Sequence, residues 1–112
     1  MRYVLMIGGE EIGGPPSVEV CGREEVRAWI EEVERRGMYR GGELLHPSSD
    51  ATTVRVRDGE VLRTDGPFAE TKEQVGGLCL LECADLDEAL EIASRHPVAR
   101  FGVIEVRPVW EA

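Results

Sequence analysis

The stretch GGLCLLECADLDEALEIASRHP, residues 76–97, changes its hydrophobic pattern from that of a strand to that of a helix. Residues 76–83 have apolar side chains on both sides of an extended chain, which indicates a strand buried on both faces. Asp85 and Glu88 then have the spacing of a capping box, with Asp in place of Ser or Thr. An apolar helical stripe follows at Leu86, Ala89, Leu90 and Ala93. The stretch therefore predicts a strand and then a helix, which ends before Pro97.

A second helix is predicted upstream, between two extended segments. Residues 3–7 form a continuous apolar run that fits a buried strand, and residues 39–45 form a short strand or an extended connection. Between them, residues 23–36 have acidic side chains near the start and arginines near the end, which matches a helix dipole. The apolar stripe of this helix is Val26, Trp29, Ile30 and Val33. Gly37 is placed to end it.

A β-hairpin is predicted in the centre of the chain. In TTVRVRDGEVLRT, residues 52–64, valines alternate with polar residues on either side of the two-residue turn Asp58-Gly59. An Asp-Gly pair between alternating runs is typical of a tight hairpin. A last strand is predicted over residues 101–106. The order strand, helix, strand or hairpin, strand, helix, strand predicts an α+β, ferredoxin-like split β-α-β fold with an added β-hairpin.

The predicted strands carry apolar side chains on both faces of the sheet, whereas two amphipathic helices cover only one face. Leaving the second face in water would expose several large side chains, each of which contributes about 1.5–3 kcal/mol when it is buried. We therefore expect the second face to pack against another copy of the chain. The predicted assembly is a sheet-to-sheet homodimer.

Composition and charge narrow the class of protein. With 112 residues, 42% hydrophobic and 31% charged, the chain is expected to form one globular domain over residues 1–112. The net charge of −9 disfavours nucleic acid and anionic membranes as partners, because no basic cluster compensates for it. No apolar run approaches the roughly 20 residues that span a bilayer. The N-terminus is interpreted as a strand rather than a signal peptide, so we expect a cytoplasmic protein.

The sequence predicts neither a cofactor nor a metal. Gly8-Gly9 and Gly13-Gly14 lack the spacing of dinucleotide and phosphate loops, and no His/Cys ligand set is present. Cys79 and Cys83 lie roughly 13 Å apart along one predicted strand at about 3.3 Å per residue, too far to form a disulfide. Together with Cys21 they are interpreted as buried free thiols in a reducing compartment.

The candidate functional segment is TDGPFAETKEQ, residues 64–74. Gly66 and Pro67 restrict the turn and would hold the Asp65 carboxylate in a defined place. Phe68 would either anchor the loop in the core or form the wall of a pocket. Loops on rigid scaffolds often carry functional sites, but a solvated, charged turn explains the same residues, so both interpretations remain open here.

The charged residues of this segment include an unusual lysine. Glu70 and Glu73 flank Lys72, which is the only lysine in a chain with twelve arginines. An isolated lysine fits a position that needs a compact ammonium group, although its occurrence by chance is the simpler alternative.

Further candidates lie outside this segment. His46 precedes a carboxylate by four residues, and an imidazole near a carboxylate can act as a general base, with a surface histidine as the alternative. His96 is expected at a helix C-terminus, where it would interact with the dipole. Arg55 and its neighbours on the hairpin would present guanidinium groups to an anionic ligand. Pairing of Arg57 with Glu60 across the turn explains one of them without a ligand.

The segment VRVRDGEVLRTDGPFAETKEQ and the residues after it resemble the YCII-related, or DGPF-domain, family. The match to the family's motif core is DGPFAETKE, residues 65–73, and the likeness covers nearly the whole chain. The resemblance implies a ferredoxin-like fold, a dimeric α/β barrel built through the sheets, and a small cytoplasmic bacterial protein. Relatives in the wider superfamily are proposed lyase-like or dehalogenating enzymes with a His–Asp pair. Members often accompany extracytoplasmic-function sigma factors, which suggests a regulatory context.

Two functional hypotheses follow, and the sequence leaves open whether the protein is an enzyme. In the first, Asp65 is the acid/base of a small-molecule enzyme and His46 is its partner. The candidate ligand-binding residues are Arg55, Phe68, Glu70, Lys72 and Glu73. In the second, a non-catalytic homodimer binds a small organic ligand or a regulatory partner. The motif is then architectural, with Asp65 capping a turn and its charged neighbours forming ion pairs at the dimer seam.

Overall fold

The computed structural model describes residues 1–11 and 23–111. Its strands and helices are, in chain order, β1 (Arg2–Glu10), α2 (Arg23–Arg35), β2 (Tyr39–Leu44), β3 (Thr52–Arg57), β4 (Glu60–Asp65), β5 (Glu73–Glu82), α3 (Leu86–Ser94) and β6 (Val103–Pro108). Short 3-10 helices lie at Ser48–Asp50 and Pro97–Arg100. Each strand and helix predicted above is present, within a few residues of its expected bounds.

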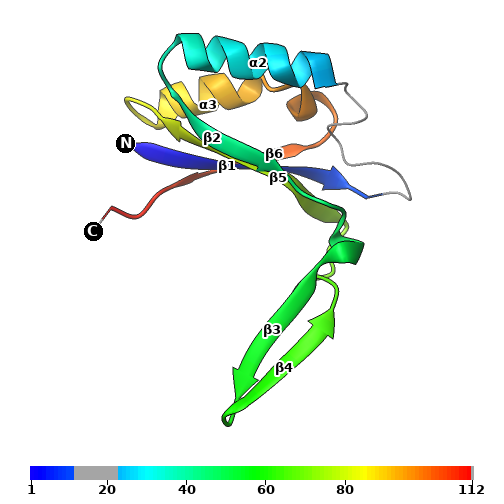
Figure 1. Cartoon of the computed structure of the whole chain (residues 1–112). Coiled ribbons are helices and arrows are strands. Elements are labelled where there is room, and N and C mark those ends of the chain that lie inside the picture. The colour runs from blue at the N-terminus through cyan, green and yellow to red at the C-terminus, as the bar shows by residue number, and fades with distance from the viewer. Residues whose placement is uncertain (12–22, 112) are drawn as a thin grey trace.

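The four-stranded sheet has the order β2-β5-β1-β6, and each neighbouring pair is antiparallel. This order is that of a ferredoxin-like split β-α-β unit in which β1 and β5 are central. Both helices lie on the same face of the sheet (Figure 1). The hairpin β3–β4 is inserted between β2 and β5 and forms a separate two-stranded sheet. The predicted α+β fold with an added hairpin is therefore confirmed.

Helix α2 begins and ends as its sequence predicts. Glu24 and Glu25 lie in its first turn and Arg35 in its last. After the helix, Gly37 donates its N–H to the carbonyl of Glu34 at 2.9 Å, which satisfies a carbonyl of the last turn. Within the described part of the chain, neither helix is long and apolar enough to cross a membrane.

Helix α3 has the predicted cap but a different buried face. The Asp85 side chain accepts the N–H of Glu88 at 2.9 Å, and the Glu88 carboxylate accepts the N–H of Ala84 at 2.9 Å. The buried residues are Ala89, Ile92 and Ala93. Leu86 and Leu90 are each 46% exposed, so the predicted stripe was wrong at these two positions. The helix is rotated so that Ile92 faces the core.

The core lies between the helices and one face of the sheet. From the strands and the residue after β5 it takes Tyr3, Leu5, Ile7, Cys79, Leu81 and Cys83, and from the helices and the segments after them Trp29, Val33, Met38, Ala89, Ile92, Ala93 and Val98. Cys79 and Cys83 are buried free thiols, as predicted, whereas Cys21 lies outside the described residues. The other face of the sheet, which we call the open face, carries Val4, Met6, Leu78, Leu80 and Val103. No layer of the described chain covers the open face (Figure 1).

The hairpin projects from one end of the sheet, away from the helices (Figure 1). Asp58 and Gly59 at its turn both have positive φ, 51° and 77°, as a tight Asp-Gly hairpin turn requires. The pairing places Val54, Val56 and Val61 on one face of the hairpin, where they are 60%, 58% and 66% exposed. The radius of gyration is 15.6 Å, larger than the roughly 13 Å of a compact domain of about 100 residues.

Candidate functional site

The predicted functional segment is a short connection tied to the base of the hairpin. Strand β5 begins at Glu73, so the loop is shorter than the sequence indicated. Gly66 donates its N–H to the carbonyl of Ala51 at 2.7 Å, and its own carbonyl accepts the Thr53 hydroxyl at 2.8 Å. Its φ of 101° is a conformation that side-chain-bearing residues rarely adopt. Gly66 therefore has an architectural role in the motif.

The end of the loop is held by two polar side chains. Gln74 donates to the carbonyl oxygens of Ala69 at 3.1 Å and Thr71 at 3.2 Å. The Thr71 hydroxyl donates to the carbonyl oxygen of Glu73. These bonds close the loop on itself, so part of the motif serves to fix its shape.

His46 lies opposite this loop, in the connection between β2 and β3. Its Nδ1 is 3.0 Å from Oδ2 of Asp50, one turn further along the chain. The structure thus pairs His46 with Asp50 rather than with Asp65. The same connection is fixed by Glu11, whose carboxylate accepts the backbone N–H of Ser48 at 2.9 Å and also the Ser48 hydroxyl.

The two connections enclose a hollow of about 490 Å³, which we call the loop pocket. Phe68 is 81% exposed, so it does not anchor the loop in the core and instead forms a wall of this pocket. The polar side chains of the lining include His46, Ser48, Asp50, Thr71, Glu73 and Gln74. The pocket thus combines an aromatic wall with hydrogen-bonding groups and an imidazole–carboxylate pair, which suits a small organic ligand.

The remaining charged candidates are placed differently. Lys72 forms an ion pair with Glu10 of β1, with Nζ and Oε1 3.1 Å apart. Together with Glu70 it lines a smaller hollow of about 310 Å³ beside the loop pocket. Asp65 lies at the end of β4 opposite Thr52 and lines neither hollow.

Arg55 lies further out on the hairpin, where it pairs with Leu62. Arg55 lines neither the loop pocket nor the smaller hollow beside it, so it would not contact a ligand in either of them. Arg57 lies opposite Glu60 in the register, as predicted, but its guanidinium donates to the carbonyl of Val56.

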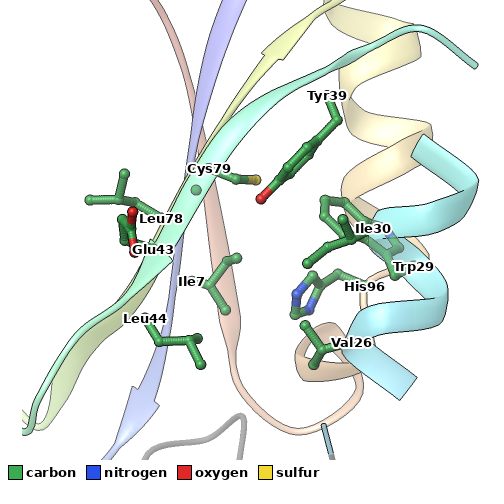
Figure 2. Close-up of a pocket in the computed structure, with 11 residues that line it drawn as sticks. Ile7, Val26, Trp29, Ile30, Tyr39, Glu43, Leu44, Leu78, Cys79 and His96 are labelled. Carbon is green, nitrogen blue, oxygen red and sulfur yellow. The ribbon is translucent and has the colours of Figure 1, made fainter. Parts of the chain in front are cut away.

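The structure contains a third hollow, which the sequence did not indicate. This helix–sheet cavity, of about 350 Å³, lies between α2 and the sheet (Figure 2). Its apolar lining includes Ile7, Val26, Trp29, Ile30 and Leu44. Tyr39 from β2, Cys79 from β5 and His96 add polar atoms to it. Figure 2 shows these three side chains between the strands and the helices.

His96 does not have the role predicted for it. It is only 2% exposed, and its Nδ1 accepts the N–H of Val98 at 3.1 Å. Burial lowers the pKa of the imidazole from 6.5 to about 4. The ring is therefore neutral near neutral pH and does not act as a cation at the end of α3. His96 instead caps the 3-10 helix that begins at Pro97.

The Tyr39 and Cys79 side chains meet over a glycine. A Cβ on Gly42 would lie 2.8 Å from both the Tyr39 hydroxyl and the Cys79 Cβ, so only glycine leaves room for the phenol. Burial raises the pKa of the Tyr39 phenol, and the nearby Cys79 adds to the effect. Burial also raises the pKa of the Cys79 thiol to about 12. Both groups are therefore protonated and act as neutral hydrogen-bonding groups.

Comparison with known proteins gives the family. The model of the YCII-related domain matches residues 1–112. The chain belongs to the YCII-related family. An uncharacterised protein of Rhizobium meliloti (strain 1021) is 49% identical in an alignment of length 99, and the match covers 73% of this chain and 80% of that protein.

A solved structure supports the fold of this YCII-related protein. It is 5-chloro-2-hydroxyhydroquinone dehydrochlorinase (TftG) from Burkholderia phenoliruptrix AC1100, in complex with 2,5-dihydroxybenzoquinone. The two structures align with a TM-score of 0.56 and 14% identity, covering 100% of this chain and 96% of the other. At this identity the likeness concerns the fold alone.

Proposed function

We propose that this YCII-related protein binds a small organic molecule in the loop pocket. The observation that carries the proposal is the convergence of the Phe68 ring and the His46–Asp50 pair on one hollow of about 490 Å³. Binding sites for small molecules are typically concave and apolar, with a few well-placed polar groups. The backbone bonds of Gly66 and the side-chain bonds of Gln74 hold one wall of this pocket in place.

We further propose that the protein acts as a homodimer, in which a second copy covers the open face. Leu78 and Val103 on that face are 40% and 41% exposed. The hairpin supports the same conclusion, because a two-stranded hairpin alone is only marginally stable in water. Its exposed valine face lacks a partner among the described residues and is suited to packing against a second copy.

The dimer would also complete the loop pocket. His46 has a side chain 87% exposed and Phe68 is 81% exposed, so the single chain leaves this pocket open to water. A hollow on the open face, lined by Met6 and Val103, shares Glu73, Gln74 and Val75 with the loop pocket. A copy that covers the open face therefore reaches the edge of the loop pocket and reduces its contact with solvent.

General acid–base catalysis at His46 is the second candidate function, and the bond to Asp50 favours it. A carboxylate that accepts from Nδ1–H fixes the tautomer and leaves Nε2 available to take up a proton, as in catalytic triads. Asp65 lines neither hollow, so we assign the acid–base role to His46 with Asp50 as its positioning residue. If His46 catalyses no reaction, the protein is a non-catalytic binding or regulatory protein of the cytoplasm that uses the same pocket to bind its ligand.

The structural relative TftG indicates which compounds to test first. Its complex contains 2,5-dihydroxybenzoquinone, a small ring with several oxygens. We propose this compound and catechol as initial probes of the loop pocket. Both are small enough for a hollow of this size and carry oxygens that would meet His46 and the polar lining.

Chemical-shift mapping by NMR tests the proposal. Binding in the loop pocket would move the backbone amide signals of the non-proline residues in the ranges 45–51 and 67–75 as either probe is added. Phe68→Ala should weaken binding by about tenfold, since it removes the aromatic wall. The matched control is Phe101→Ala, because Phe101 is 50% exposed and lines neither the loop pocket nor the helix–sheet cavity. Equal binding to all three proteins, or shifts confined to other residues, would contradict the proposal.

A further inference from the structure

The helix–sheet cavity is separate from the loop pocket and shares no lining residue with it. Its volume of about 350 Å³ lies at the small end of the range for ligand sites, roughly 300–1,000 Å³. An apolar cavity of about 150 Å³ already holds benzene. The helix–sheet cavity is therefore large enough for one ring with a substituent, and its walls are mainly aliphatic and aromatic.

His96, a buried residue, lines this cavity and supplies it with a hydrogen-bond donor. Since Nδ1 of His96 accepts the Val98 N–H, the neutral ring carries its proton on Nε2. Among residues 1–11 and 23–111, the structure gives no acceptor for this Nε2–H. The ring edge is held in place by the Trp29 indole, whose centroid is 4.8 Å away at an interplanar angle of 68°. A ligand oxygen inside the cavity can accept this N–H.

Tyr39 supplies a second polar atom from the sheet. Its hydroxyl lies above Gly42 and beside Cys79, where no side chain at position 42 intervenes. Figure 2 shows Tyr39 directed toward the interior of the cavity, across from the His96 ring. A hydroxyl both donates and accepts, so this group can pair with either kind of ligand atom.

The charge of the lining selects against ions. Glu43 is the charged residue of the described lining, and Figure 2 shows it with Leu78 on the far side of the strands from the helices. The side chains that face the cavity from α2, β1 and β5 are apolar or a protonated thiol. Burying an unpaired ionic ligand here would cost several kcal/mol. The cavity thus suits an uncharged molecule.

We propose that the helix–sheet cavity is a second binding site, for a neutral single-ring molecule whose oxygen accepts a hydrogen bond from Nε2–H of His96. The Tyr39 hydroxyl is the second contact of that oxygen or of a neighbouring substituent. Trp29, Ile30 and Val26 of α2 hold the ring against the sheet.

Three ring compounds of similar size test the proposal. Acetophenone has a carbonyl oxygen, ethylbenzene has none, and benzoate is an anion. We expect acetophenone to bind three- to tenfold more tightly than ethylbenzene, because a net hydrogen bond is worth about 0.5–1.5 kcal/mol, and benzoate not to bind. The measurement is the indole N–H signal of Trp29 during titration. Trp110, which is 91% exposed, is replaced by Phe so that one indole signal remains.

Variants distinguish this cavity from other sites. Val26→Phe fills the cavity from α2 and should abolish acetophenone binding, whereas Leu90→Phe, on α3 and outside the lining, should leave it unchanged. Tyr39→Phe should weaken binding by a few-fold, and His46→Asn, in the loop pocket, should have no effect. Tighter binding of ethylbenzene or benzoate than of acetophenone would overturn the proposal, and so would binding that survives Val26→Phe in a folded protein. The comparison of the three compounds needs no variant beyond the Trp110 replacement, so it stands even if Val26→Phe fails to fold.

Discussion

The indole of Trp29 packs edge-on against the imidazole of His96, with ring centroids 4.8 Å apart and an interplanar angle of 68°. The same indole donates its N–H to the carbonyl of Ile92 at 3.0 Å. Helix α2 is thereby joined to the end of α3, and the imidazole is held in the core without a charged partner in either contact. Because burial lowers the pKa of this imidazole, His96 couples the stability of the protein to pH.

We expect acid to destabilise the protein through His96. The folded-state pKa is lowered to about 4 from 6.5, so the unfolded chain binds this proton more readily. The stabilisation is complete above pH 6.5 and is lost as the pH falls toward 4, by a total of the order of 3 kcal/mol. The measurement is the free energy of unfolding by urea at several pH values. His46→Asn should keep this dependence, while His96→Asn should remove it. An unchanged dependence in His96→Asn would show that another group is responsible.

Substitutions in the DGPF motif should affect the free energy of unfolding strongly at architectural residues and weakly at surface residues. Gly66→Ala should lower the free energy of unfolding by about 1–3 kcal/mol, because the added methyl group strains a backbone with φ of 101°. The added Cβ would meet no steric clash, since its nearest neighbour among the described residues would be Glu70 Oε1 at 3.9 Å. Lys72→Met should change the free energy of unfolding by less than about 1 kcal/mol, since the Lys72 side chain is 81% exposed. Chemical denaturation measures both variants, and a larger loss for Lys72→Met would contradict this division.

Cys79 should be unreactive in the folded protein. Its thiol pKa is raised to about 12, which reduces the reactive thiolate about a thousandfold relative to a thiol with a pKa of 9. We expect iodoacetamide to leave Cys79 unmodified in native buffer and to modify it in urea, as read by peptide mass spectrometry. Rapid native labelling of Cys79 would mean that the helix–sheet cavity opens far more than the structure shows.

The valine face of the hairpin should control assembly. Val61→Lys replaces one of the three exposed valines of this face with a charged residue and should shift the protein toward a single-chain species. Leu62→Lys, on the opposite face of the same strand, is the matched control and should have little effect. Size-exclusion chromatography with light scattering measures the mass of each variant. An unchanged mass in Val61→Lys would show that this face lies outside the seam.

The fold could be predicted well from the sequence because hydrophobic periodicity and turn residues are local signals. The Asp58-Gly59 turn and the Asp85 cap need only neighbouring residues, and both were predicted correctly. The buried face of α3 was wrong at Leu86 and Leu90, since the rotation of a helix depends on what it packs against. The apolar pattern of α3 alone could not indicate this rotation.

The candidate site was harder to predict because it joins distant segments. The bond between His46 and Asp50 spans four residues and was within reach of the sequence, but its position opposite Phe68 depends on the whole sheet. The helix–sheet cavity was missed because His96, Tyr39 and Gly42 come from separate elements. A glycine within β2 and a histidine just before Pro97 are the signals that would have pointed to it.

Sedimentation velocity of the 112-residue chain at micromolar concentration tests the central claim, that a second copy covers the open face. We expect a species of about twice the chain mass of 12.4 kDa, which converts to the single chain when the open-face residue Leu78 is replaced by Lys. A stable species of 12.4 kDa for the unmodified protein would contradict the claim, and with it the closure of the loop pocket by a partner.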